Sequence, residues 1–287
     1  MAIQNSLTKK KTNTGIGAYL SQESIKKRIN EVVGSENGQR LITAIVSATT
    51  ANKQLQECNH QSILSAALVG ESLKLSPSPQ LGQYYMVPFK NTRTHSTDAQ
   101  FQLGYKGYIQ LALRSGQYKK LNVMAIKEGE LINFNPLDEE IDVDLIQDEQ
   151  ERENAPTIGY YAMFEYLNGF KKAMYWSREK MESHALKYSK GYQAKKGYTF
   201  WEKDFDGMAY KTMLRQLISK WGIMSIELQT ALDSDMAVIN QDGTKNYVEN
   251  DENYIDVERP IKSNKADTPP NPPSDENDVA SALFSEE

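Results

Sequence analysis

Apolar residues recur at helical spacing through the first part of the chain. In SQESIKKRINEVV, which begins at Ser21, the apolar side chains share one face until Gly34 interrupts the pattern. Residues 36–55 and 59–75 repeat the same spacing, and SPSP at 76–79 then breaks it. Because proline cannot continue a helix, the pattern predicts an N-terminal segment of three amphipathic helices.

The pattern changes to β-favouring residues after residue 82. QYYMVPFK (83–90) and AQFQL (99–103) predict two strands around a polar loop, and Pro88 indicates either a sheet edge or a bend in the first strand. YKGYIQLALRSG predicts a helix closed by Gly116. Further strands are expected at 118–127, 130–134 and 140–146, followed by an exposed acidic loop.

Two apolar runs, TIGYYAMFEYL and FKKAMYW, flank the dipeptide Asn168–Gly169. This arrangement predicts a β-hairpin with a two-residue primed turn. Ser177 then suits the N-cap of a helix over SREKMESHALKYS. After a polar loop, WEKDFDGMAYKTMLRQLISKW predicts one long helix ending near Gly222, and residues 225–239 predict a last amphipathic helix.

From residue 242 the chain turns acidic and rich in proline, as in TPPNPPSDEND. Such a composition cannot bury enough apolar surface to fold, so we expect a disordered tail at 242–287. Its end, VASALFSEE, is either a plain terminus or a partner-docking peptide. The predicted fold class is α+β: a small antiparallel or mixed sheet with a hairpin, packed against several helices. We expect a flexible basic arm at 1–18 and a core at 19–241.

Composition limits the class of protein. The chain has 287 residues and one cysteine, which excludes an internal disulfide and fits a reducing cytosol. No apolar run is long enough to span a membrane, and the N-terminus lacks the apolar core of a signal peptide.

The net charge of −5 hides a strong asymmetry along the chain. Residues 1–127 hold sixteen Lys or Arg against six Asp or Glu, whereas residues 128–153 hold one Arg against eleven acids. Since binding depends on the local field, the basic first part favours an anionic partner despite the negative total.

The segment QFQLGYKGYIQLALRSGQYKK (100–120) mixes glycine, tyrosine and basic residues. A strand that enters a helix through GYKG exposes backbone N–H groups, and Lys106 in the first helical turn opposes the macrodipole unless an anion is near. Lysines with aromatic rings are typical of grooves for single-stranded nucleic acid. The alternative is that the aromatics are core residues and the lysines ordinary surface.

A second basic and aromatic cluster covers residues 187–221 and includes Trp201 and Lys203. Lys211 and Arg215 are four residues apart, so they share one face of the predicted helix. No P-loop and no G-x-S-x-G nucleophile motif occurs, so neither an ATP-driven motor nor a serine hydrolase is indicated. The carboxylates of 128–153 fit a solvated face, a partner-binding or DNA-mimicking surface, or a catalytic or divalent-metal site. No cofactor is expected, although a role for Mg²⁺ stays open.

The order of these features resembles the RecT family of phage single-strand annealing proteins. The resemblance is carried by CNHQSILSAALVGESLKLSPSPQLGQYYMVPF (58–89), QFQLGYKGYIQLALRSGQY (100–118), the hairpin, and WEKDFDGMAYKTMLRQLISKW (201–221). It implies binding of single-stranded DNA and annealed duplex, annealing without ATP or a catalytic site, and a ring or filament of copies around a basic groove. It also implies a bacterial host cytoplasm, a phage 5′→3′ exonuclease and the host single-strand-binding protein as partners.

The resemblance and the two clusters together give the candidate DNA contacts. They are Gln102, Tyr105, Lys106, Gly107, Arg114, Lys119, Lys120, Trp201, Lys203, Lys211 and Arg215. Two other functions stay open from the sequence: a passive scaffold for single-stranded nucleic acid, and a metal-dependent nuclease that uses the carboxylates of 138–153.

Overall fold

A computed structural model of the chain describes residues 15–91, 96–197 and 199–247. These residues belong to one unit, Met1–Asp256, and the second unit, Val257–Glu287, lies outside the described residues. The basic arm and the acidic tail expected from the sequence therefore fall almost entirely outside the described part of the chain.

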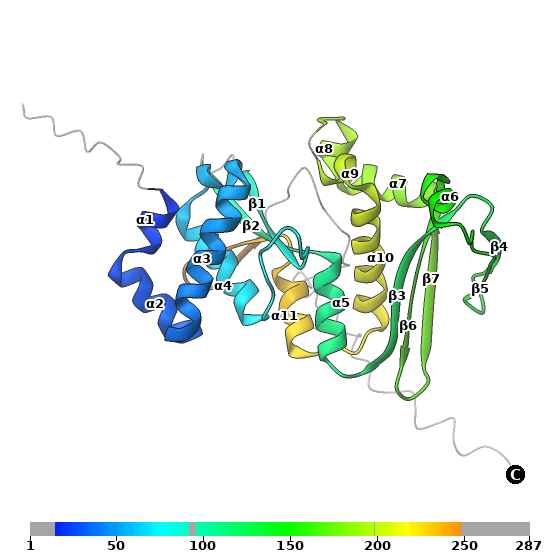
Figure 1. Ribbon diagram of the computed structural model, residues 1–287, viewed down its shortest axis with the longest axis horizontal. Helices are drawn as coiled ribbons and strands as arrows, with labels where there is room; N and C mark the ends of the chain where they lie inside the picture. Colours follow the sequence, from blue (N-terminus) through cyan, green and yellow to red (C-terminus); the bar gives the residue numbers. More distant parts are fainter. Residues whose placement is uncertain (1–14, 92–95, 198, 248–287) are drawn as a thin grey trace, which may run out of the picture. The chain divides into compact units, whose positions relative to one another are not determined.

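The described chain begins with the helical segment that the sequence predicts (Figure 1). Its elements are α1 (Ile16–Leu20), α2 (Glu23–Val33), α3 (Ser35–Ala51), the 3-10 turn η1 (Lys53–Glu57) and α4 (His60–Ser72). Gly34 ends α2 with a positive φ of 81°, a conformation that suits glycine. The side chain of Asn59 caps α4 by accepting from the Gln61 N–H.

The first sheet joins strands from the two ends of the unit. Its order is β1 (Tyr84–Asn91), β2 (Ser96–Leu103), β8 (Ala237–Ile239) and β9 (Lys245–Tyr247), all antiparallel. Pro88 lies in the edge strand β1, the first of the two expected alternatives, where a missing N–H leaves no neighbour unpaired. The expected core boundary at residue 241 falls between β8 and β9, so this sheet continues past it.

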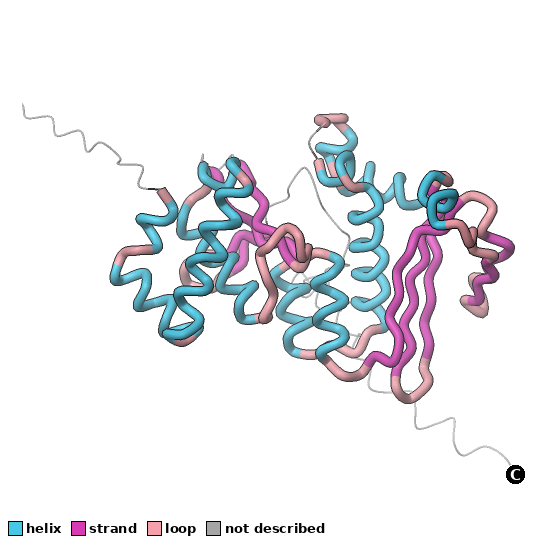
Figure 2. Tube along the Cα trace, in the orientation of Figure 1, coloured by secondary structure: helices cyan, strands magenta, loops and turns pink. Residues whose placement is uncertain are grey.

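The second sheet has the order β3 (Tyr118–Lys127), β6 (Thr157–Tyr166) and β7 (Lys171–Ser177), again antiparallel. Between β3 and β6 the chain forms a separate hairpin of β4 (Leu131–Asn135) and β5 (Glu140–Val143). The acidic stretch after it is not all loop, because Glu149–Asn154 forms α6, with Asp148 as its N-cap. Figure 2 shows the second sheet as three adjacent magenta strands.

The turn of the β6–β7 hairpin differs from the predicted primed turn. Gly169 has a φ of 87°, but Asn168 does not have a positive φ, which a type I′ turn requires. The Gly169 N–H donates to the Tyr166 carbonyl at 3.0 Å, and the Tyr166 N–H donates to the Phe170 carbonyl at 2.9 Å. This is the pattern of a three-residue loop that ends in a left-handed glycine. The Asn168 carboxamide oxygen stabilises it by accepting from the Phe170 N–H.

The remaining helices are α5 (Tyr105–Arg114), α7 (Arg178–Tyr188), α8 (Lys190–Gln193), α9 (Phe200–Lys203), α10 (Phe205–Trp221) and α11 (Ile226–Ser234). The long helix predicted from 201 is divided at Asp204, which caps α10 by accepting from the Gly207 N–H. The last helix is shorter than predicted because Met236 has a positive φ of 67° and the chain then enters β8.

Two hydrophobic clusters form the core, and α10 belongs to both. The first gathers α1 to α4, the first sheet and α5, and it includes Leu214 and Ile218 of α10. The second lies between the second sheet and α7, α9 and α10, and it includes Met213 and Leu217. Every residue from 211 to 218 is buried, so α10 is enclosed on all sides along its centre. The fold class is α+β, as predicted.

Candidate nucleic-acid interface

Strand β1 meets α9 and the start of α5 meets α10, which brings together the two basic and aromatic clusters of the sequence. The rings of Tyr85 in β1 and Phe200 in α9 lie 6.0 Å apart between centroids. The Tyr105 ring of α5 makes an edge contact with Tyr210 of α10 at 5.6 Å. Segments about a hundred residues apart in sequence therefore share one aromatic surface.

Two lysines lie beside these rings. Lys106 is exposed, and its ammonium lies 5.9 Å from the centroid of the Tyr105 ring. Lys203 is exposed in α9, three residues after Phe200, and so lies on the same side of that helix. We call Tyr85, Tyr105, Lys106, Phe200 and Lys203 the aromatic–lysine surface.

The two glycines of GYKG serve close packing at this junction. A Cβ on Gly104 would lie 2.1 Å from the Gly82 carbonyl oxygen, and one on Gly107 would lie 2.1 Å from that of Gln83. The Gly104 N–H also donates to the Gln83 carbonyl at 2.9 Å. Gly107 is buried, so packing against the chain before β1 accounts for its place in the motif.

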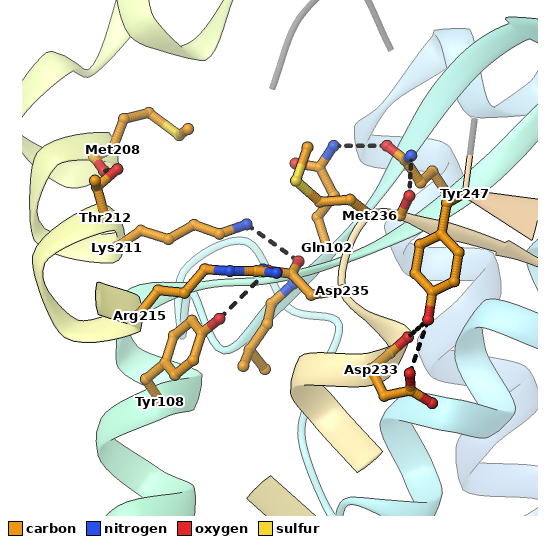
Figure 3. Close-up of polar contacts among 12 residues, drawn as sticks. Gln102, Tyr108, Met208, Lys211, Thr212, Arg215, Asp233, Asp235, Met236 and Tyr247 are labelled. Atoms are coloured by element: carbon orange, nitrogen blue, oxygen red, sulfur yellow. Dashed lines mark hydrogen bonds and ion pairs between the residues drawn. The ribbon is translucent and has the colours of Figure 1, made fainter. Parts of the chain in front are cut away.

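Lys211 and Arg215 occupy a different place from the one expected. Their exposed fractions are 4% and 6%, and both side chains reach Asp235 (Figure 3). The Lys211 ammonium lies 3.2 Å from one oxygen of Asp235, and the Arg215 guanidinium contacts the other. Burial lowers the pKa of Lys211 from its ordinary value, although the carboxylate opposes that shift.

Asp235 also connects α10 to the start of the aromatic–lysine surface. Its carboxylate accepts from the Leu103 N–H at 2.8 Å and from the Tyr108 hydroxyl at 3.4 Å. Leu103 ends β2 and Tyr108 lies in α5, so one buried carboxylate ties two elements to the two cations of α10. We correct the expectation of phosphate contacts for Lys211 and Arg215 accordingly: in this structure they form a buried ionic cluster.

Two more expected contacts are buried. Trp201 is 3% exposed, and its ring packs against Phe205 at 5.0 Å within the second cluster. Gln102 is 4% exposed, and its amide donates to the side-chain oxygen of Gln100 at 2.9 Å. These side chains support the core instead of facing solvent.

Three further candidates are exposed but already have partners. The Arg114 guanidinium donates to the Leu73 carbonyl at 2.8 Å, and so caps the end of α4. Lys119 and Lys120 lie 2.6 Å and 3.7 Å from the two carboxylate oxygens of Glu165 on β6. The hydrogen bond from Lys119 lowers the pKa of Glu165. These cations stabilise the fold as well as adding positive charge to the surface.

Sequence reasoning missed Tyr85 and Phe200 as candidates. The signal for Tyr85 was the alternation of β1, which buries Tyr84 completely and turns its neighbour outward. Phe200 has no comparable signal, because it stands next to a buried tryptophan in a helix of one turn.

Within the described ranges, no group of three or more His, Cys, Asp or Glu side chains is placed to hold a metal ion. No described helix is long and apolar enough to cross a membrane.

Comparison with known proteins assigns the chain to a family. The family model described as "RecT family" matches residues 39–253. The chain is 39% identical to the Bacillus subtilis (strain 168) "Uncharacterized protein YqaK", over 93% of this chain and 89% of that protein. It is 30% identical to the Escherichia coli (strain K12) "Protein RecT", over 78% of this chain and 81% of that protein.

The chain belongs to the RecT family. Membership implies binding of single-stranded DNA and annealing of strands in recombination. Proteins of this family are annealing proteins and generally not catalytic enzymes.

Proposed function

We propose that this chain anneals complementary DNA strands without ATP, and that one strand lies along the aromatic–lysine surface. The observation that carries the proposal is that exposed Lys106 lies beside the Tyr105 ring, and that exposed Lys203 shares α9 with Phe200, whose ring contacts Tyr85. Ammonium groups would follow the phosphate backbone, and the rings would accept bases of any sequence. Base pairing with the second strand would supply the specificity.

We also propose that the working form is an oligomer, either a ring or a filament. Each copy offers few accessible cations at this surface, so tight binding to a long strand requires several copies bound side by side. A positive surface that continues between copies would lower the phosphate repulsion along the whole strand. In this scheme the protein acts in phage or prophage recombination beside a 5′→3′ exonuclease and the host single-strand-binding protein, and it also holds the annealed duplex.

An annealing assay tests the proposal. Two complementary oligonucleotides, one with a fluorophore and one with a quencher, are mixed with the full chain without ATP, with and without Mg²⁺. We expect faster quenching than without protein, and slower quenching for the Lys106→Ala, Lys203→Ala double variant. Slower pairing with the unaltered chain would instead support a passive scaffold, and shortened strands with Mg²⁺ would support a nuclease.

Lys27→Ala provides a matched control for that assay. Lys27 lies on α2 with a side chain that is 80% exposed, away from the aromatic–lysine surface, and it faces Glu31 at 3.9 Å. Its loss removes one positive charge, as Lys106→Ala or Lys203→Ala alone does, and should leave annealing unchanged. Equal losses in the control and in either of those single variants would show that total charge matters and that this surface does not.

A further inference from the structure

The β4–β5 hairpin carries exposed apolar side chains among acidic residues. Leu137 at its turn is 91% exposed and Ile132 on β4 is 67% exposed. From residue 128 to residue 151 the sequence has no lysine or arginine. Among the described residues, no cation lies within ion-pair distance of Glu140 or Asp142. We call residues 131–143 the acidic arm.

The arm is held on one side. Its Phe134 ring lies 5.3 Å from the Tyr175 ring of β7, and Glu139 pairs with Lys172. A groove of about 570 Å³ lies between the arm and strands β6 and β7. The arm is therefore anchored to the second sheet, while Leu137 and Ile132 stay in solvent.

A second exposed apolar surface lies where α5 and α10 end, α11 begins and the β6–β7 hairpin turns (Figure 1). The exposed fractions of its large apolar side chains run from 45% to 80%. We call it the Trp221 patch, and it consists of Leu113, Leu167, Phe170, Trp221, Ile223 and Ile226.

Hydrogen bonds and a ring contact hold the elements of the Trp221 patch together. The Tyr166 hydroxyl donates to the Trp221 carbonyl at 3.2 Å and accepts from the Ile223 N–H. The Phe170 ring stacks on the Tyr166 ring at 5.9 Å. The Leu167 N–H donates to the Gln117 carbonyl, just after α5. These side chains thus belong to one continuous region of the unit.

The edge of the Trp221 patch is basic. Lys171 follows Phe170 directly, and Lys220 precedes Trp221; both are exposed. The ammonium of Lys172 lies 3.9 Å from the centroid of the Trp221 ring, but it already pairs with Glu139 of the same copy, so Lys171 and Lys220 supply the remaining positive charge. Hydrogen bonds with its own backbone and with the Ser225 side chain lower the pKa of the nearby Glu227. The positive charges of Arg114 and Lys74 lower it further. The patch therefore combines an apolar centre with a positive edge.

We infer that the acidic arm of one copy docks on the Trp221 patch of the next copy, an inference that rests on the proposed oligomer. Exposed apolar groups of this number normally mark an interaction surface. The two surfaces match in apolar character and are opposite in charge, which favours arm against patch over either surface against itself. A contact between two different surfaces is heterologous, so it repeats from copy to copy and gives a ring or a filament.

Sedimentation of aspartate variants tests the inference. Leu137→Asp on the arm and Ile226→Asp on the patch should each shift the full chain from the assembled form towards the monomer, with unchanged circular dichroism. Val32→Asp is the control, because Val32 is 59% exposed on α2, outside both surfaces, and should assemble like the unaltered chain. Equal assembly of all three variants would overturn the inference.

Cross-linking decides which surfaces meet. Leu137→Cys and Ile226→Cys are prepared as separate single variants, and a short bismaleimide is added to each alone and to their mixture. Burial raises the pKa of the native Cys58 thiol to about 12, so it should not react near neutral pH. We expect cross-linked pairs from the mixture alone. Pairs from either single variant, or assembled protein without mixed pairs, would overturn the inference.

The two proposals fail in different ways. If the unaltered chain sediments as a monomer with and without DNA, the proposed oligomer fails, and this interface fails with it. If it assembles and anneals but the arm and patch variants assemble equally well, the interface alone is wrong.

Discussion

Replacing Lys106 and Lys203 by alanine should change how DNA binding depends on salt. Both ammonium groups are exposed, and the structure shows no ion pair within the described residues that would offset their loss. Each lysine that neutralises a phosphate of a single strand adds about 0.7 to the slope of log K against log salt. The double variant should therefore have a slope shallower by about 1.4, which amounts to about 25-fold weaker binding at about 0.1 M salt.

Fluorescence anisotropy of a labelled oligothymidylate at several salt concentrations measures this slope, expressed per bound copy. The variant should weaken binding to every sequence alike, because phosphate contacts carry no base readout. Lys27→Ala should keep the slope of the unaltered chain. A double variant with an unchanged slope would show that DNA does not follow the aromatic–lysine surface.

Three predictions concern buried residues. Asp235→Ala leaves two buried cations without their carboxylate, so denaturant unfolding should show a loss of about 3–5 kcal/mol; a loss below about 1 kcal/mol would contradict the buried ionic cluster. Gly107→Ala would push a Cβ against the Gln83 carbonyl and should cost about 1–3 kcal/mol, measured in the same way, and an unaffected midpoint would show that the two segments can separate freely. Burial acts to raise the pKa of Glu130, but hydrogen bonds from Arg152 and the backbone lower it below the ordinary 4.5. Its stabilising contribution is thus complete above that value and is lost as the pH falls through the lowered pKa. The unaltered chain should therefore lose more stability than Glu130→Gln between about pH 7 and about pH 3.5, and equal losses would refute this assignment.

Much of the fold could be predicted from the sequence because local signals agree with the structure. Helical spacing with Gly34 as a stop predicts α2, and Ser177 accepts from the Lys180 N–H as the predicted N-cap of α7. The predictions fail where a longer-range contact or one backbone angle determines which element the chain forms. The spacing after 225 is helical, but pairing of residue 237 with Phe101 of β2 turns the chain into a strand.

The candidate site was harder to predict, since charge and spacing cannot tell a buried cation from an exposed one. Lys211 and Arg215 share a helix face, as expected. That face meets Asp235, which lies far from both residues along the sequence. Nothing in residues 211–215 alone predicts that this carboxylate lies beside them. Lys106 and Lys203 are exposed because they lie at helix starts and ends, where fewer neighbours cover them.

The enclosed centre of α10 has a consequence for how the unit comes apart. Leu214 and Ile218 face one hydrophobic cluster, while Met213 and Leu217 face the other, so neither cluster keeps a complete interior once this helix leaves. The two halves should melt in one transition, and a fragment that ends before residue 205 should not hold even the N-terminal helices and β1–β2 in their native packing. Because a single helix is part of both interiors, the chain cannot be divided into smaller modules that fold independently.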